Sequence, residues 1–149
     1  MCASAASRVL IVEDDGAVRG FLGRALESGG YVPVPVRTGE EALQLLRAGE
    51  PMAAVLIDGI LPDMHGLRLA DSILDSPSGA DIAICFVTGA LRETAPAVAG
   101  IGALSKPLRL AELLGFLDVL MRWRAAGGSA AADRREALRR MEQAFLVGP

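Results

Sequence analysis

The chain has 149 residues, with 15 basic and 18 acidic side chains, a net charge of −3 and hydrophobic residues at 52% of its positions. This length provides for one domain with a proper core and a short appendage. No apolar run approaches the roughly 18 residues of a transmembrane helix, so we expect no membrane insertion, and two cysteines give neither a disulfide framework nor a metal-binding spacing.

Residues 1–7 form the first segment, and we expect a disordered tail there. The segment has neither the basic start nor the apolar core of a signal peptide. One cysteine, Cys2, lies in this tail, and the other, Cys85, lies inside a later apolar run. This cysteine usage is typical of a reducing cytoplasm.

Short apolar runs recur along the chain, and each of them leads into polar residues that can do chemistry. Their length and composition are typical of strands buried on both faces of a parallel sheet. The runs are residues 9–12 before Glu13, Asp14 and Asp15, residues 53–57 before Asp58, residues 82–87 before Thr88, and residues 100–105 before Lys106.

Stretches with the helical spacing of apolar residues lie between these runs, at residues 18–26, 42–46 and 67–74. Strand and helix alternate about five times in roughly 120 residues, which predicts a doubly wound α/β domain. In such a sheet, functional groups collect at the carboxyl ends of the strands. We therefore expect the polar residues to converge in one crevice, although they are far apart in sequence.

The carboxylates of this crevice predict a divalent cation, because acids that lie close together repel one another unless a cation neutralises them. Hard oxygen ligands with room for water and phosphate favour Mg²⁺. Lys106 is the only lysine among 15 basic residues, and its compact charge suits a small anion in a narrow site. With the Thr88 hydroxyl, Lys106 would cradle a phosphoryl group, for which an aspartate can be the nucleophile.

These motifs together resemble the receiver domain of two-component response regulators. The matching segments are residues 9–15, 56–66, 87–90 and 104–108. The resemblance implies a flavodoxin-like fold over residues 8–124, with a five-stranded parallel sheet in the order 2-1-3-4-5.

The resemblance also implies the roles of the site residues. Asp58 would accept a phosphoryl group from a sensor histidine kinase or a phosphotransfer protein. Thr88 would hydrogen-bond this group, Lys106 would pair with it, and the peptide bond before Pro107 would be cis. The implied Mg²⁺ ligands are Asp14 and Asp58 directly, Glu13 through water, and the backbone carbonyl of Ile60.

Two features depart from the family pattern. Ala103 stands three residues before the lysine, where the family commonly has an aromatic switch residue that moves with the threonine. Only 18 residues separate Thr88 from Lys106, and the shortening should fall in the fourth helix, residues 91–99. Pro96 also interrupts this segment, so we expect a brief or irregular helix.

Two further positions bear on output and on the lifetime of the phosphoryl group. Ile60 and Ala90 are apolar at positions that tune hydrolysis in the family, which predicts a long-lived phosphoryl group. The signal should leave by protein contact through an altered face around the fourth helix, the fifth strand and the fifth helix, residues 110–124.

The C-terminal segment is expected to be a separate unit. Residues 125–129 predict a flexible joint, and residues 130–149 predict an amphipathic helix with Leu138, Met141 and Phe145 on its apolar stripe. Six arginines and three acids give a net charge of +3 from Arg122 onward, against −6 before it. About 25 residues cannot hold a helix-turn-helix, so we expect no nucleic-acid binding.

Three interpretations of this segment stay open. It is a helix that folds back or swaps onto the receiver, within one molecule or in a homodimer. It is a docking arm for a kinase or a downstream target. It is a solvated amphipathic tail.

The sequence therefore predicts a single-domain response regulator, which is a phosphoacceptor and not an enzyme that turns over a separate substrate. One alternative is a pseudo-receiver, a binding module that works without phosphate. Ala103 and the shortened fourth helix favour it, whereas the complete set of acids, Thr88 and Lys106 opposes it. The other is a phosphatase of the haloacid dehalogenase type. That enzyme expects its nucleophile after the first strand and an acid two residues later, whereas Ile60 stands two residues after Asp58.

Overall fold

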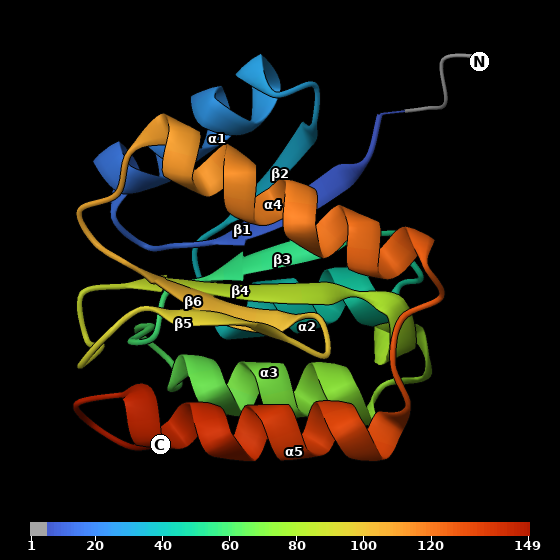
Figure 1. Ribbon diagram of the computed structural model, residues 1–149. Helices are drawn as coiled ribbons and strands as arrows, with labels where there is room; N and C mark the ends of the chain where they lie inside the picture. The colour runs from blue at the N-terminus through green and yellow to red at the C-terminus, as the bar shows by residue number, and fades with distance from the viewer. Residues whose placement is uncertain (1–5) are drawn as a thin grey trace.

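A mixed, six-stranded sheet forms the centre of the computed structural model, which describes residues 6–149; the predicted tail, residues 1–7, therefore lies largely outside the described residues. Its strands are β1 (Arg8–Val12), β2 (Val32–Val36), β3 (Ala54–Ile57), β4 (Ala83–Thr88), β5 (Ala95–Val98) and β6 (Ile101–Ser105). Their order is β2-β1-β3-β4-β6-β5, and only β5 runs antiparallel to its neighbour (Figure 1). The parallel strands confirm the predicted doubly wound sheet and its order.

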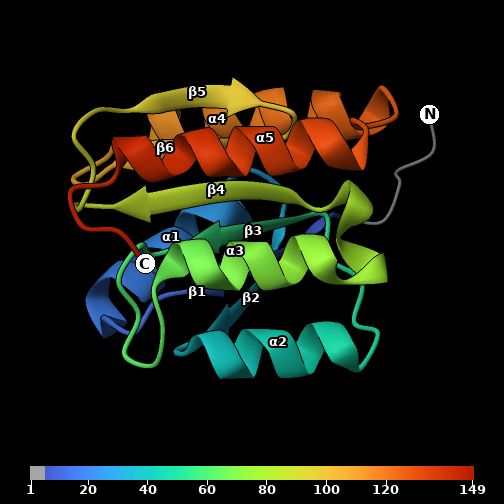
Figure 2. The same cartoon turned by 90° about the horizontal axis from the view of Figure 1, so that it is seen from below.

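Helices cover both faces of this sheet. They are α1 (Gly16–Ser28), α2 (Gly39–Arg47), α3 (Gly66–Asp75), α4 (Leu110–Ala125) and α5 (Ala131–Met141), with short 3-10 helices at Pro77–Asp81 and Glu142–Ala144. Helices α1 and α4 lie on one face, whereas α2, α3 and α5 lie on the other (Figures 1 and 2). Alternate residues of β1 enter the two cores, Val9 and Ile11 on one side and Leu10 and Val12 on the other. Between residues 6 and 149, no helix has the length and apolarity needed to cross a bilayer.

Polar residues in the loops after β1 and β3 cap the helices that follow these loops. The Asp15 carboxylate accepts the N–H groups of Ala17 and Val18 at 2.9 and 3.1 Å, and so caps α1. His65 caps α3, because its Nδ1 accepts the Leu67 N–H at 3.1 Å. Each cap satisfies backbone donors that the first helical turn leaves without partners. The loops at the carboxyl edge of the sheet are therefore anchored by helix starts.

The segment predicted as the fourth helix, residues 91–99, is not helical, and this prediction was wrong. It leads into β5, whose residues alternate between half-buried and exposed as they pair with β6 at the edge of the sheet. Pro96 has no N–H to donate, which an edge strand tolerates and a helix interior does not. Ala99 and Gly100 form the two-residue turn to β6, with φ angles of 52° and 75°, as twisted antiparallel strands favour.

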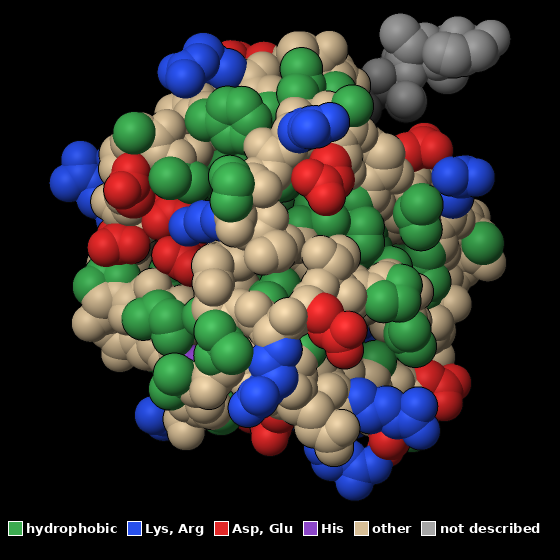
Figure 3. All heavy atoms as spheres, turned by 60° about the vertical axis from the view of Figure 1, so that its left-hand side comes forward, with side chains coloured by type: hydrophobic (Ala, Val, Ile, Leu, Met, Phe, Trp, Pro, Cys, Tyr) green, Lys and Arg blue, Asp and Glu red, His purple; other side chains and the backbone are tan. Residues whose placement is uncertain are grey.

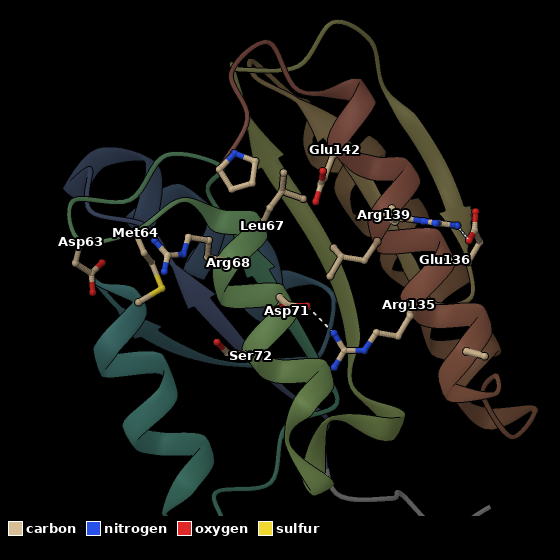
Figure 4. A pocket seen from close by; sticks show the side chains of 13 residues that line it. Asp63, Met64, Leu67, Arg68, Asp71, Ser72, Arg135, Glu136, Arg139 and Glu142 are labelled. Atoms are coloured by element: carbon tan, nitrogen blue, oxygen red, sulfur yellow. Dashed lines mark hydrogen bonds and ion pairs between the residues drawn. The ribbon is translucent and has the colours of Figure 1, made fainter.

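Helix α5 covers the part of the sheet face that this hairpin leaves without a helix. It lies beside α3 (Figure 2), and its apolar residues Leu138 and Met141 are buried. A groove of about 870 Å³ lies between α3 and α5, and Arg135 reaches across to Asp71 with an N–O distance of 2.5 Å (Figure 4). In one molecule, therefore, the C-terminal helix is folded back onto the receiver-like part of the chain.

Arg134 fixes the position of α5. Its side chain is 1% exposed, and its guanidinium donates to four backbone carbonyls at 2.5 to 3.1 Å. These carbonyls belong to Gly79, Ala80, Ile82 and Ala99. The guanidinium also lies 4.7 Å from the centre of the Trp123 ring. Burial lowers the pKa of Arg134 to about 10, so the group is still charged at neutral pH.

Candidate functional site

The carboxyl ends of β1, β3, β4 and β6 meet at one edge of the sheet, and polar residues follow or end each of them. These residues are Glu13, Asp14, Asp58, Thr88 and Lys106. Figure 3 shows acidic side chains gathered next to a basic one on this side of the molecule. Residues predicted from separate parts of the sequence thus lie in one place.

Three carboxylates form the centre of the site. Glu13, Asp14 and Asp58 each offer an oxygen, and these oxygens lie within 4.8 Å of one another. Glu13 is 2% exposed, Asp58 is half-buried and Asp14 is exposed. Like charges at this spacing destabilise one another, and a cation relieves the repulsion. Carboxylate oxygens are the donors that hard divalent cations prefer.

Lys106 provides one positive charge within this cluster. Its Nζ lies 2.7 Å from Glu13 Oε1 and 3.5 Å from Asp58 Oδ2. Burial acts to lower the pKa of Lys106, but the hydrogen bond to Glu13 and the charges of both carboxylates outweigh burial and raise it. Burial raises the pKa of Glu13, while its hydrogen bond from Lys106 opposes the rise. Lys106 therefore carries a positive charge at neutral pH. The peptide bond between Lys106 and Pro107 is cis, as the resemblance implied.

Thr88 is the last residue of β4, and its side chain lies beside Gly59, the residue that follows Asp58. The side chain is 1% exposed, and its Oγ1 accepts the Ala90 N–H at 3.1 Å. A Cβ atom on Gly59 would lie 2.9 Å from Thr88 Oγ1 and 2.5 Å from Phe145 Cε1. Glycine at position 59 thus lets both side chains approach the loop closely. Because the Thr88 oxygen accepts the Ala90 N–H, the hydroxyl hydrogen is left to donate elsewhere.

The loop after β3 forms a second side of the site. The Ile60 N–H donates to Asp58 Oδ1 at 3.4 Å, and Ile60 forms an antiparallel bridge with His65. The Ile60 side chain is 49% exposed. The Ile60 backbone therefore contacts the Asp58 carboxylate, whereas the Ile60 side chain is apolar and largely exposed to solvent.

Sequence reasoning missed the place of Phe145. The residue lies beyond the end of α5 and is 3% exposed, with its ring edge-on to Phe86 at 5.3 Å and to His65 at 5.2 Å between centroids. Ala103 is buried in the same apolar core and offers only a methyl group there. Phe145 was expected on a helix over residues 130–149, but α5 ends at Met141 and Phe145 follows a short 3-10 helix in extended backbone. No local pattern indicates a contact between segments so far apart. The short interval before Lys106 was the one signal that another segment must fill this face.

The comparisons with known proteins agree on one family. The model of the response regulator receiver domain matches residues 9–118. The response regulator receiver protein CpdR of Brucella abortus is 33% identical over 118 residues, which cover 76% of this chain and 96% of CpdR. The response regulator MprA of Mycolicibacterium vanbaalenii is 37% identical over 120 residues, which cover 77% of this chain but only 50% of MprA. The family match ends at residue 118, so α5 and the residues after it lie beyond it.

Solved structures show the same fold. A sensor protein from Polaromonas sp. JS666 is similar with a TM-score of 0.70 and 28% identity, over 79% of this chain and 98% of that one. A CheY-like receiver domain protein from Methanospirillum hungatei JF-1 has a TM-score of 0.69 and 27% identity, over 83% and 99% of the two chains.

Proposed function

The chain belongs to the receiver domains of two-component response regulators, and on this basis we propose that Asp58 is its phosphoacceptor. The position of the Asp58 carboxylate carries the proposal. Asp58 follows the last residue of β3, and its carboxylate lies next to those of Glu13 and Asp14. The Lys106 ammonium is 3.5 Å from an Asp58 oxygen. A transferring phosphoryl group needs a nucleophilic oxygen together with fixed positive charge, and this arrangement supplies both.

The chemistry would be a direct transfer to the carboxylate. An Asp58 oxygen attacks the phosphorus of a phosphohistidine, the new O–P bond forms as the P–N bond breaks, and the electron pair returns to the imidazole. The product is an acyl phosphate. Lys106 would neutralise phosphoryl oxygens, and the Thr88 hydroxyl would donate to one of them. The donor class is a sensor histidine kinase or a phosphotransfer protein.

The carboxylate cluster also supports Mg²⁺ as the cofactor of this reaction. The proposed ligands are Asp14 and Asp58 directly, Glu13 through water, and the backbone carbonyl of Ile60. Glu13 already accepts from Lys106 on Oε1 and from the Asp15 N–H on Oε2, which favours its contact through water. When bound, Mg²⁺ supplies the positive charge that offsets repulsion between the carboxylates and the incoming phosphoryl group.

We propose that the signal leaves through contact with a downstream protein. The exposed arginines Arg139 and Arg140 on α5 form ion pairs with Glu136. A surface of such mixed charge is unlike the continuous basic patch of a nucleic-acid-binding protein. Leu138 and Met141 are already buried within one molecule. Their stripe is therefore not free to form a homodimer while α5 stays docked.

A pseudo-receiver is the second candidate function, because Lys106 is already paired with Glu13 and β5 stands where a helix was expected. Such a protein would keep the fold and bind its partner without phosphate. Phosphorylation that depends on Mg²⁺ separates the two candidates.

Incubation with acetyl phosphate and Mg²⁺, followed by intact-mass measurement, tests the proposal. We expect one phosphoryl group on the wild type, none on the Asp58→Asn variant, and none on either when EDTA is present. A wild type that gains no phosphoryl group and forms no beryllofluoride complex would support the pseudo-receiver. Turnover of phosphate esters would instead indicate a phosphatase.

A further inference from the structure

The residues after α5 form a short ladder with the loop that follows Thr88. We call residues 144–147 the C-terminal strap. Its two hydrogen bonds to the loop run from the Leu146 N–H to the Ala90 carbonyl and from the Arg92 N–H to the Ala144 carbonyl, both at 2.7 Å. Between them, Phe145 forms an antiparallel bridge with Leu91. The strap is therefore attached to the segment that leads away from the candidate phosphoryl site.

The end of the strap is attached to the other loop of the site. His65 Nε2 lies 2.8 Å from the Val147 carbonyl. Because His65 Nδ1 accepts the Leu67 N–H, the ring hydrogen belongs on Nε2, which donates to Val147. The strap thus contacts the loops that follow both β3 and β4.

Phe145 inserts between these loops. Its buried ring packs edge-on against Phe86 and His65, and it lies beside Thr88 over the bare backbone of Gly59. A buried phenylalanine removes about 150–250 Å² of surface from water. It is therefore the main apolar contact of the strap.

Ala90 connects the strap to the Thr88 hydroxyl. Its N–H donates to Thr88 Oγ1 at 3.1 Å, and its carbonyl accepts the Leu146 N–H at 2.7 Å. Ala90 is thus hydrogen-bonded to the candidate site through its N–H group and to the strap through its carbonyl. A shift of this loop toward Asp58 would change both hydrogen bonds.

We propose that the C-terminal strap is a latch that phosphorylation of Asp58 loosens, so that the C-terminal end of α5 is released from the receiver. The inference rests on the proposed function of Asp58. A phosphoryl group brings nearly two negative charges and strong acceptor oxygens. The Thr88 hydroxyl and the backbone N–H groups that follow it, at the end of β4, can donate hydrogen bonds to these oxygens. Drawing these donors toward Asp58 moves the Ala90 carbonyl away from Leu146 and opens space around Phe145.

Coupling of this kind is reciprocal. If phosphorylation weakens the strap, the docked strap must oppose phosphorylation by the same factor. A strap without the Phe145 ring should therefore let a phosphoryl mimic bind more tightly. This effect on affinity is one that loss of packing alone would not produce.

Hydrogen exchange on the full-length wild type gives the first test. Backbone amides of Arg92 and Leu146 are followed with Mg²⁺ alone and with Mg²⁺ and beryllofluoride, which mimics a phosphoryl group on aspartate. We expect exchange to become roughly three- to tenfold faster with the mimic, the size of one lost hydrogen bond. Unchanged or slower exchange would overturn the latch. Asp58→Asn, treated in the same way, should show no change.

A Phe145→Ala variant gives the second test, with Val147→Ala as its matched control. The Val147 side chain is 61% exposed and keeps its backbone hydrogen bond. Fluorine NMR measures bound beryllofluoride as its concentration rises. We expect a midpoint at least about threefold lower for Phe145→Ala and an unchanged midpoint for Val147→Ala. Equal midpoints for the wild type and Phe145→Ala would contradict the proposal, and if this variant does not fold, exchange in the wild type decides.

The two proposals fail in different ways. If acetyl phosphate gives no adduct and beryllofluoride does not bind the wild type, Asp58 is not a phosphoacceptor and the latch falls with it. If phosphorylation occurs and the strap amides keep their exchange rates, only the latch is overturned.

Discussion

The Lys106 ammonium donates a 2.7 Å hydrogen bond to the Glu13 carboxylate, across 93 positions of the chain. The bond joins the end of β6 to the end of β1, with β3 and β4 between them in the sheet. Glu13 is almost fully buried, so its charge depends on this partner. The Lys106–Glu13 pair therefore links the ends of β1 and β6 and stabilises the charge of the buried Glu13 carboxylate.

Replacing Lys106 by Met should destabilise the protein by about 1–3 kcal/mol at neutral pH, because the buried Glu13 carboxylate loses its charged donor. Urea unfolding measures the loss. The double variant Lys106→Met, Glu13→Gln should recover most of it, since the most buried carboxylate of the site, Glu13, then carries no charge that needs a partner. A double variant as unstable as the sum of the two single changes would contradict this explanation.

Replacing Arg134 by Met should cost roughly 2–4 kcal/mol of unfolding free energy, because four backbone carbonyls, two of them on the buried residues Gly79 and Ile82, lose their donor. Arg140→Met is the control. That side chain is 77% exposed and, within residues 6–149, pairs only with Glu136, so its loss should stay below about 0.5 kcal/mol. Similar losses in both variants would mean that Arg134 does not anchor α5.

Asp63 should stabilise the start of α2 in a way that depends on pH. It accepts the N–H groups of Gly39 and Glu40 at 3.0 and 2.9 Å. Burial acts to raise the pKa of Asp63, but these hydrogen bonds lower it below the ordinary value of 3.8. A carboxyl with a lowered pKa stabilises the fold above its unfolded-state pKa, and this stability is lost as pH falls through the folded-state value.

We therefore expect Asp63→Asn to be less stable than the wild type by roughly 0.5–1 kcal/mol at neutral pH. The difference should disappear as the pH falls below 3.8, and urea unfolding across this range measures it. A difference that is equally large at neutral pH and at about pH 2 would show that the charge of Asp63 is not responsible.

Ile60→Asn should shorten the lifetime of a phosphoryl group on Asp58 several-fold. The Ile60 backbone N–H contacts the acceptor carboxylate, and the wild-type side chain at this position is exposed and apolar. An amide side chain at position 60 can orient water for attack on the phosphorus. The decay of the phosphorylated intact mass measures both lifetimes. A wild-type lifetime no longer than that of the variant would rule out a protective role for Ile60.

The strands and the site could be predicted from sequence because their signals are local. Runs such as residues 9–12 are long enough for a strand and buried on both faces, and a parallel sheet then brings their ends together. Asp58 and Lys106 are thus predicted to be neighbours without any knowledge of the loops between them.

The hairpin and the position of α5 could not be predicted in the same way. Residues 91–99 were assigned to a brief or irregular helix on the family pattern, although Pro96 argues against a helix interior and is tolerated in an edge strand. The docking of α5 depends on Arg134 finding carbonyls 35 to 55 positions away. Such contacts leave no periodic pattern in the sequence. The apolar stripe of α5 therefore predicts that the helix packs against the protein, but it does not predict the surface on which the helix packs.

The most direct test of the account is to locate the phosphoryl group. The wild type is phosphorylated with acetyl phosphate and Mg²⁺, reduced with borohydride, which converts an aspartyl phosphate to homoserine, and digested for peptide mass spectrometry. We predict homoserine at position 58 alone, and none when EDTA replaces Mg²⁺. Homoserine at Asp14 or at another carboxylate, or at no position in a folded sample, would contradict the assignment of Asp58 as the phosphoacceptor.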